Sequence, residues 1–223
     1  MKVVKLVIFD LDGTLIDSAE DIAHSVNEVR DQLEVSPLPL ATIEGYIGNG
    51  VRRLLELALA DSERDVVDRA HELYLPIYRR RLLDNTRPYP GVVPALEELD
   101  GSERTLAVLT NKPVRESVMI LEGLGLRRHF AFVYGGDSFE HKKPDPTGAE
   151  HLLDDVGVGC DETLFVGDSS VDLETARRAR VPCCLVTYGI QPERIASLEP
   201  DYRVDDLREL APIVRAQSRG DSR

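Results

Sequence analysis

Short apolar runs and longer amphipathic stretches alternate along most of this chain. A short run of apolar and β-branched residues, bounded by turn residues, indicates a buried strand. The first such run covers residues 3–9, is interrupted only by Lys5, and ends at Asp10. Further runs predict strands at residues 105–109, 130–133, 163–166, 183–186 and, more weakly, 202–204.

Stretches with apolar residues at helical spacing lie between most of these strands. They predict helices at residues 92–99, 114–124 and 173–179, and another that ends near Val156. A chain in which strands and helices alternate folds as a parallel sheet with helices on both faces. We therefore predict an α/β fold with a Rossmann-like parallel sheet.

One block of the chain breaks this alternation. From Asp17 to about Arg87 the pattern is helical throughout, with no strong strand run. Ser18, followed three residues later by Asp21, resembles an N-terminal helix cap. Further helices are predicted from Thr42, over residues 51–59 and over residues 65–83. We predict that residues 17–87 form an inserted all-helical cap domain and that residues 1–16 and 88–223 form the core.

Composition and charge narrow the range of partners. The chain has 223 residues, 42% hydrophobic and 30% charged, which is ordinary for a globular protein of one or two domains. Its formal charge of −13 argues against nucleic acid and anionic membrane surfaces as partners. No apolar run approaches the length of a membrane span or signal peptide. Cys160, Cys183 and Cys184 are not spaced as a zinc site, so we expect free thiols and a cytoplasmic protein.

The end of the first strand carries two carboxylates. Side chains on a strand alternate between faces, so Asp10 and Asp12 are expected on one side and Leu11 on the other. Two buried carboxylates that converge repel each other and lose solvation. Such a pair persists when a cation lies between the carboxylates or when one holds a proton for chemistry. The alternative is that one Asp caps the next helix, with Gly13-Thr14 as a turn.

Two later strands also end in polar residues. Thr110-Asn111 follows the second predicted strand, and Asp168, with Asp172 four residues later, follows the fourth. Parallel strands bring these ends to one edge of the sheet, where open α/β folds bind ligands. Separately, Asp168 and Thr110 are as readily interpreted as helix caps, and Lys143 as a solvated surface lysine. Their joint occurrence in this order favours a functional site.

These segments resemble the four motifs of the haloacid dehalogenase-like hydrolases. The motifs are Asp10-Leu11-Asp12-Gly13-Thr14-Leu15, the strand-ending Thr110, Lys143-Pro144, and Gly167-Asp168-Ser169-Ser170-Val171-Asp172. The helical insertion stands where that superfamily carries its first type of cap. Ile47-Gly48-Asn49-Gly50, Pro90-Gly91-Val92, Leu109-Thr110-Asn111-Lys112-Pro113 and Gly135-Gly136-Asp137 are similar to segments of phosphoglycolate phosphatases. One departure is Arg180, where such proteins usually place a glycine.

The resemblance implies a Mg²⁺-dependent phosphatase that forms an aspartyl-phosphate. Asp10 would be the nucleophile, because a carboxylate attacks phosphorus without prior deprotonation. The metal would be held by Asp10, the backbone carbonyl of Asp12, and Asp168. Lys143 and Thr110 would hold phosphoryl oxygens, and Asp12 would serve as general acid and then base. Asp172 would orient Lys143 or the metal shell.

Substrate selection is expected at the cap. Gly48-Asn49-Gly50 precedes the helix predicted from Val51, and a helix N-terminus attracts anions. Arg52 and Arg53 follow, and either guanidinium is a candidate to bind a carboxylate. The alternative is that both arginines are solvated on the cap surface. Thr14 and Asn111 are further candidate substrate-binding residues.

The resemblance leaves several functions open. The resemblance best fits a phosphatase that hydrolyses a small phosphate monoester, with 2-phosphoglycolate as the preferred candidate substrate. The alternatives are a pyrophosphatase, a sugar phosphomutase and a non-catalytic phosphate-binding regulatory module. A dehalogenase would not need Asp12, and a phosphonatase would need a cap lysine, whereas residues 17–87 contain none. The expected partner is a small phosphorylated metabolite, bound by a monomer or homodimer.

Overall fold

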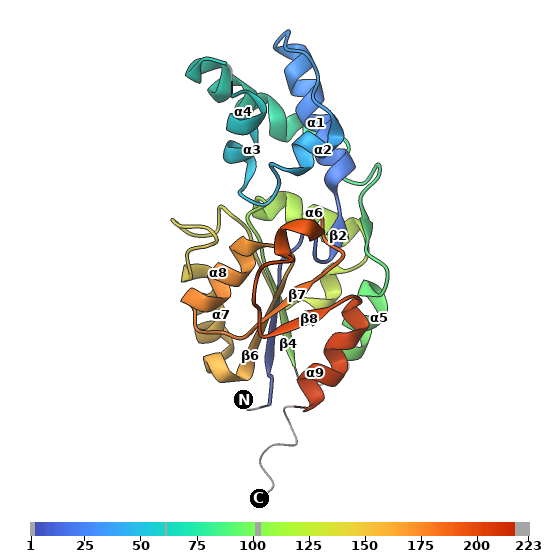
Figure 1. The fold of residues 1–223 in the computed structure, drawn as a ribbon, viewed down its shortest axis with the longest axis vertical. Coiled ribbons are helices and arrows are strands. Elements are labelled where there is room, and N and C mark those ends of the chain that lie inside the picture. The colour runs from blue at the N-terminus through green and yellow to red at the C-terminus, as the bar shows by residue number, and fades with distance from the viewer. Residues whose placement is uncertain (1–2, 61, 101–103, 217–223) are drawn as a thin grey trace, which may run out of the picture.

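The strands of the core form one parallel sheet. The computed structural model describes residues 3–60, 62–100 and 104–216, so residues 1–2, 101–103 and 217–223 of the predicted core and residue 61 of the predicted cap lie outside the described residues. The sheet has six strands in the order β5-β4-β1-β6-β7-β8 (Figure 1). They are β1 (Leu6–Phe9), β4 (Thr105–Leu109), β5 (Phe132–Tyr134), β6 (Thr163–Gly167), β7 (Cys183–Val186) and β8 (Tyr202–Val204). The prediction of an α/β parallel sheet is confirmed.

Two strands differ from the sequence prediction at their ends. β1 begins at Leu6 rather than at residue 3, because Val3 and Lys5 are exposed and Lys5 pairs with Glu162 at the sheet border. β5 begins two residues later than predicted and includes Tyr134. An apolar run marks where a strand is buried, but the ladder of hydrogen bonds decides where it starts and ends.

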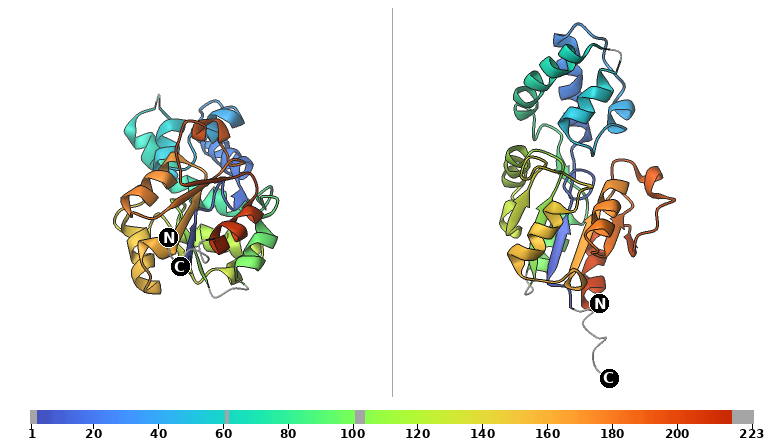
Figure 2. Two further views of the ribbon diagram at one scale, coloured as in Figure 1. Left: turned by 60° about the horizontal axis from the view of Figure 1, so that its bottom comes forward. Right: turned by 90° about the vertical axis from the view of Figure 1, so that its left-hand side faces the viewer.

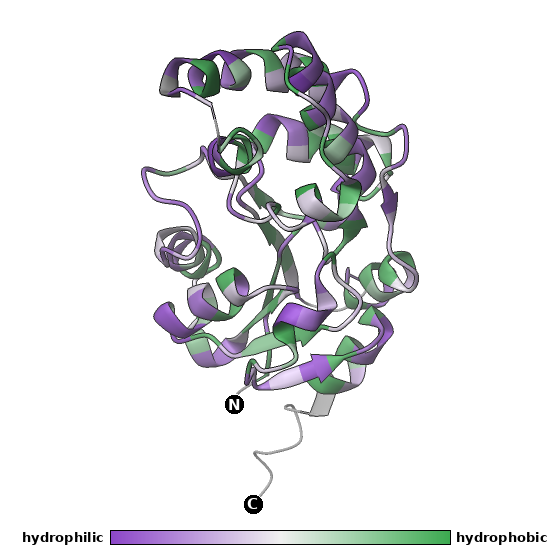
Figure 3. Ribbon diagram, turned by 45° about the horizontal axis from the view of Figure 1, so that its top comes forward, coloured by the Kyte–Doolittle hydropathy of each residue, from purple (hydrophilic) through white to green (hydrophobic). Residues whose placement is uncertain are grey.

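Helices cover both faces of the sheet, and the strand residues alternate between them (Figure 2). Val7 and Phe9 pack with α5 (Val92–Asp100), α6 (Val114–Gly123) and α9 (Leu210–Ala216). Leu6 and Ile8 pack on the other side with α7 (Thr147–Val156) and α8 (Ser170–Arg178). Figure 3 shows the resulting pattern, with apolar strands inside and polar helix faces outside. Short 3₁₀ turns complete the core at Arg127–His129, Cys160–Glu162, Pro192–Ile195 and Leu207–Glu209.

The helical insertion, defined here as residues 18–60 and 62–86, lies beyond the carboxyl ends of the strands (Figure 1). Its helices are α1 (Ala19–Gln32), α2 (Leu40–Glu44), α3 (Val51–Ala58) and α4 (Arg64–Arg79). α1 packs on α2 and α4, and α3 packs on α4. The chain enters and leaves through a two-stranded antiparallel pair, β2 (Ile16–Asp17) and β3 (Arg87–Pro88).

Two local predictions have instructive outcomes. Ser18 stands at the N-cap of α1, as predicted, but its side chain makes no capping hydrogen bond and instead donates to Asp12 Oδ1. Arg180 follows α8 with a φ of 58°. The left-handed backbone that usually calls for glycine is therefore kept, at a cost of about 1–2 kcal/mol for an L-residue.

Two further expectations concern the cysteines and membranes. Cys160, Cys183 and Cys184 are all free thiols, as predicted. Within the described part of the chain, no helix combines the length and apolar character needed to cross a bilayer.

Candidate active site

The polar residues after β1, β4 and β6 meet at one edge of the sheet. These strands are neighbours in the sheet, so their carboxyl ends lie side by side. The backbone N–H of Asp10 donates to Val166 (2.9 Å), and the Asp10 carboxylate accepts from the N–H of Leu11 (2.7 Å). Asp10, Thr110 and Asp168 are all buried. Parallel topology thus brings together residues that are more than 150 positions apart.

Lys143 is the cation at the centre of this edge. Its side chain is buried, which removes the surface-lysine interpretation. The ammonium lies 2.9 Å from Asp10 Oδ1 and 2.7 Å from Asp172 Oδ1. Burial by itself would lower the pKa of Lys143, but these two carboxylates outweigh it and raise the pKa, so the lysine stays charged.

Asp172 holds Lys143 from the first turn of α8. Its second oxygen, Oδ2, accepts from the N–H groups of Asp168 (3.2 Å) and Ser169 (3.1 Å) and from the Ser169 hydroxyl (2.6 Å). Ser169 caps α8, so Asp168 is free of that role. Both oxygens of Asp172 therefore have partners, and its position is that of a support for Lys143.

The Asp168 carboxylate sits in a tight cradle. Oδ1 accepts from the Thr14 hydroxyl (3.3 Å), and Oδ2 accepts from the N–H of Ile190 (3.3 Å). A Cβ atom at Gly13 or Gly189 would lie 2.1 or 2.4 Å from Oδ2, so side chains at these two positions would displace it. The sequence prediction placed Thr14 at the substrate, but Thr14 is fully buried and bonds to Asp168 instead.

Carboxylate oxygens from Asp10, Asp168 and Asp172 lie within 4.8 Å of one another. Burial raises the pKa of Asp10 to about 7, opposed by Lys143 and supported by repulsion from Asp172. Burial and the same neighbouring carboxylates raise the pKa of Asp168 well above its usual range. One lysine neutralises only part of the negative charge of these buried carboxylates. A divalent cation bound among them would neutralise the rest. Asp172 already accepts from Lys143, from the Ser169 hydroxyl and from two backbone N–H groups, whereas Asp10 and Asp168 each have two donors, so Asp10 and Asp168 are the stronger candidates to bind such a cation.

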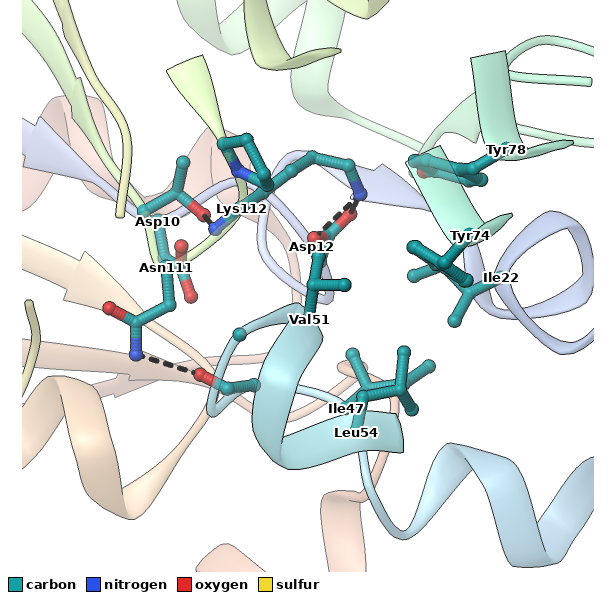
Figure 4. A pocket seen from close by; sticks show the side chains of 14 residues that line it. Asp10, Asp12, Ile22, Ile47, Val51, Leu54, Tyr74, Tyr78, Asn111 and Lys112 are labelled. Atoms are coloured by element: carbon teal, nitrogen blue, oxygen red, sulfur yellow. Dashed lines mark hydrogen bonds and ion pairs between the residues drawn. The ribbon is translucent and has the colours of Figure 1, made fainter. Parts of the chain in front are cut away.

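Asp12 faces a second lysine (Figure 4). Its oxygens accept from Lys112 Nζ at 2.6 and 2.8 Å, and Oδ1 also accepts from the Ser18 hydroxyl at 2.5 Å. Lys112 is buried and lies 4.9 Å from the centre of the Tyr78 ring. Asp10 and Asp12 both line the cavities described next, while Leu11 is buried in the core.

Sequence reasoning quoted Lys112 in a motif but gave it no role. A signal was present, because lysine is scarce in this chain and Lys112 follows a strand end by three residues.

Two cavities meet at Asp10 and Asp12, and the insertion contributes Ile47 and Gly48 to both. The α4-side cavity is closed by Tyr74 and Tyr78 of α4, the start of α3 and the turn at residues 110–113. The α8-side cavity extends over Asp168 and residues 169–171 to the segment at residues 190–195.

Core side chains hold the glycine-rich loop of the insertion through its carbonyls. Asn111 Nδ2 donates to Gly48 O (2.9 Å) and to Lys143 O (3.0 Å), and Lys142 Nζ donates to Asn49 O (2.6 Å). Gly50 has a φ of 83°, and a Cβ there would lie 2.8 Å from Lys142 Nζ. The predicted residues Gly48, Asn49, Gly50 and Asn111 therefore all reach the cavities.

Arg52 and Arg53 do not reach either cavity. About half of each side chain is exposed, and both pair with carboxylates on the insertion surface: Arg52 with Glu56 and Asp68, Arg53 with Glu56. These contacts do not support the prediction that they bind a substrate carboxylate, which stays a prediction.

Comparisons with known proteins agree with the fold and the motifs. Residues 7–186 match the family model described as haloacid dehalogenase-like hydrolase. A phosphoglycolate phosphatase of Agrobacterium fabrum is 36% identical over 213 residues, which is 94% of this chain and 91% of that protein. A phosphoglycolate phosphatase of Chromobacterium violaceum is 34% identical over 96% of this chain and 98% of its own length.

Solved structures share the whole fold. The crystal structure of a predicted phosphoglycolate phosphatase from Haemophilus somnus superposes with a TM-score of 0.91 at 31% identity, covering 96% of this chain and 99% of that one. That of a predicted phosphatase from Clostridium acetobutylicum has a TM-score of 0.84 at 23% identity, covering 96% and 100%. The chain belongs to the haloacid dehalogenase-like hydrolase family.

Proposed function

We propose that this enzyme is a Mg²⁺-dependent phosphatase that hydrolyses 2-phosphoglycolate through an aspartyl-phosphate on Asp10. The observation that carries the proposal is the contact of the Asp10 carboxylate with buried Lys143, beside a second carboxylate, Asp168. An oxygen nucleophile is thereby held at a strand end next to fixed positive charge. The names of the relatives that cover almost the whole chain support the substrate.

Asp10, Asp168 and the backbone carbonyl of Asp12 would hold the metal. The donor set fits, since Mg²⁺ prefers hard oxygen ligands and the two carboxylates are buried without full compensation. When bound, the ion would neutralise negative charge on the phosphoryl group and on the nucleophile.

The chain's own residues would carry the reaction in two steps. In the first, Asp10 forms a bond to phosphorus as the bond to the leaving oxygen breaks, and Asp12 gives that oxygen a proton. Lys143 and the Thr110 hydroxyl would hold phosphoryl oxygens as charge develops on them. In the second step Asp12 takes a proton from water as that water attacks phosphorus and releases Asp10. Lys112 and Ser18, which hold the Asp12 carboxylate at 2.5–2.8 Å, would keep it on the leaving-group side.

The helical insertion would act as the cap, with residues 17–87 as its extent. Asn111, Lys142 and Arg194 each donate to a backbone carbonyl of the segment at residues 45–49. These bonds hold the insertion over Asp10 and Asp12. A closed cap would exclude bulk water during the first step and leave a shaped space for the leaving group.

The size of the α4-side cavity supports a small leaving group. About 40 Å³ is open to the centre of a water molecule. One water needs about 10–15 Å³ by this measure, so the cavity accepts a group of about three or four heavy atoms. The carboxymethyl group of 2-phosphoglycolate has that size, whereas a larger leaving group such as p-nitrophenolate would also need space from the adjoining α8-side cavity. Pyrophosphate also fits by size, but the apolar side chains of Ile22, Ile47 and Leu54 suit a methylene group better than a multiply charged phosphate.

A phosphate-release screen tests the proposal. It compares 2-phosphoglycolate, pyrophosphate, hexose phosphates and p-nitrophenyl phosphate, with and without Mg²⁺. We expect the highest kcat/KM for 2-phosphoglycolate and loss of turnover when the metal is chelated. A preference for pyrophosphate or a hexose phosphate would overturn the substrate, and absence of all release would overturn catalysis.

We place the enzyme in the cytoplasm as a monomer or homodimer.

A further inference from the structure

One hydrogen-bond donor in the α4-side cavity has no use in the proposed mechanism. Tyr78 lines the cavity from α4 and is 2% exposed. Its hydroxyl oxygen is buried and has no hydrogen-bond partner. Leaving a buried hydroxyl unpaired is unfavourable. A buried donor without a partner, on a side chain that lines a ligand cavity, is a candidate to bind a ligand.

The acceptors around this hydroxyl are engaged by other groups. Asp12, Asp21 and Glu116 are close enough to add to burial in raising the pKa of Tyr78, so the hydroxyl remains a donor. Asp12 accepts from Lys112 and Ser18. The Asp21 carboxylate accepts from the backbone N–H and side-chain amide of Asn85 and from the backbone N–H and hydroxyl of Thr86, at 2.7–3.0 Å.

Glu116 is a competing acceptor, because it is one of the groups whose charge acts on Tyr78. Its Oε1 is bound by Arg79 at 2.6 Å, while its Oε2 is buried and has no partner. A hydroxyl that served Glu116 would support folding rather than substrate binding, and the experiment below separates these roles.

Lys112 supplies charge beside Tyr78. It is the only basic residue among the described residues that line the α4-side cavity. Two of its three N–H donors face the oxygens of Asp12, and its ammonium lies 4.9 Å from the centre of the Tyr78 ring. Figure 4 shows the Tyr78 ring reaching from α4 toward Lys112 and Asp12. One ammonium donor is thus left for a ligand in the same space.

A carboxylate on the leaving group needs such a counter-charge. The leaving oxygen must lie next to Asp12 to receive its proton, so once Asp12 has given up that proton its anion lies close to a carboxylate two bonds away. Like charges in a poorly solvated cavity repel strongly. A cation shared by Asp12 and the substrate removes that repulsion, and a neutral donor adds a directed bond to the carboxylate.

We propose that the Tyr78 hydroxyl and the Lys112 ammonium together bind the carboxylate of the leaving group. They are the specificity-determining pair of this phosphatase, in place of the surface arginines of α3. The proposal rests on the proposed function and adds to it the residues that read the substrate's second charge.

The experiment uses two substrates that differ only at the group in question. Ethyl phosphate replaces the carboxylate of 2-phosphoglycolate with a methyl group. Tyr78→Phe removes only the hydroxyl, and we expect KM for 2-phosphoglycolate to rise at least tenfold, since a hydrogen bond to a charged group is worth about 1.5–3 kcal/mol. The kinetics on ethyl phosphate should stay at wild-type values, and the melting temperature of the substrate-free enzyme should not fall. Tyr46→Phe is the matched control, because Tyr46 belongs to the insertion but lines neither cavity.

Lys112 is tested with the same pair of substrates. Lys112→Met should lower kcat on both, because Asp12 loses its partner. It should also lower the ratio of kcat/KM for 2-phosphoglycolate to that for ethyl phosphate at least tenfold, and Lys112→Arg should restore part of this ratio. A residue that only positions Asp12 would leave the ratio unchanged.

Three results would overturn the inference. An unchanged substrate ratio in both Tyr78→Phe and Lys112→Met, in an enzyme that prefers 2-phosphoglycolate, rejects the inference and leaves the proposed function standing. A Tyr78→Phe variant that melts lower and loses equally on both substrates assigns the hydroxyl to Glu116 and the fold. A wild type without preference for 2-phosphoglycolate over ethyl phosphate rejects the proposed substrate, and the carboxylate subsite with it.

Discussion

The strand ends and the helical insertion line the same cavities with different kinds of chemical group. At the strand ends, Asp10, Lys143 and Asp172 form a buried chain of contacts of 2.7–2.9 Å, and each charged group has a partner. On the insertion, Tyr78 contributes an unpartnered hydroxyl, and Gly48 is held through its backbone carbonyl. We expect the paired charges to fix the geometry that every substrate meets. On our proposal, the Tyr78 hydroxyl is left for one particular substrate.

This difference implies that variants divide into two groups. Changes at the strand ends should lower turnover of all phosphate esters, whereas changes in the α4-side cavity should alter the choice among them. The surface of the insertion should affect neither.

Asp10→Asn should have the largest effect. An amide cannot form the acyl-phosphate, so we expect kcat to fall on the order of 10⁴-fold or more on every substrate. Phosphate release from 2-phosphoglycolate and p-nitrophenyl phosphate measures it. A variant that keeps a tenth of wild-type kcat would contradict the nucleophile assignment.

Alanine variants of the adjacent residues Lys142 and Lys143 should differ sharply in kcat. Lys143→Ala removes the buried cation from Asp10 and Asp172, and we expect kcat to fall roughly 10²–10³-fold on all substrates. Lys142→Ala removes one bond from an exposed side chain to Asn49 O, so it should cost less than about tenfold. Circular dichroism would confirm that both variants fold. A larger loss in Lys142→Ala would move the active lysine by one position.

Asp12→Asn should discriminate by leaving group. The variant keeps the nucleophile but has no proton to donate, and general acid catalysis contributes about 10²–10⁴-fold. An alkyl phosphate needs that proton, whereas p-nitrophenolate leaves without it. We expect kcat to fall at least 100-fold more on ethyl phosphate than on p-nitrophenyl phosphate. Equal losses would reject Asp12 as the acid.

Metal binding should stabilise the protein in a pH-dependent way. The pKa of Asp10 rises to about 7 by burial, so the metal-free folded state binds a proton more tightly than the unfolded chain. That contribution favours folding at low pH and is lost as the pH rises from about 4 to about 7. Mg²⁺ competes with these protons. At about 100 times its Kd, Mg²⁺ should raise Tm by roughly 5–10 °C at pH 8, and by less at pH 5. A larger rise at pH 5 would contradict the assigned ligands.

Arg52 and Arg53 should have the smallest effect. Both are half exposed and pair with surface carboxylates, contacts worth about 0–1 kcal/mol to stability. The double variant Arg52→Ala, Arg53→Ala should therefore change KM for 2-phosphoglycolate less than about twofold. A tenfold increase would return carboxylate recognition to α3 and away from Tyr78.

The contrast also explains how far sequence reasoning reached. Side chains that directly follow adjacent parallel strands have positions fixed by topology, so Asp10, Thr110 and Asp168 were predicted together. Helical periodicity in the insertion identifies buried faces, but the part of a buried face that meets the core depends on how the insertion packs. Tyr78 has the spacing of an ordinary core residue, and nothing in the sequence shows that its hydroxyl lacks a partner.

Thr14 shows the same limit within a motif. The motif places it near the site, but only the fold shows that its hydroxyl supports Asp168 from a fully buried position. Lys112 was missed because its role depends on the divergence of Asp10 and Asp12 toward two different lysines.

Trapping the intermediate tests the central claim most directly. Wild-type enzyme mixed with Mg²⁺ and excess 2-phosphoglycolate would be quenched in acid within its first turnovers, digested and mapped by mass spectrometry. The account predicts one added phosphoryl group, on the peptide that contains Asp10 and at that residue, and none in Asp10→Asn treated identically. Turnover without any phosphorylated peptide, or a phosphoryl group on another residue, would contradict it.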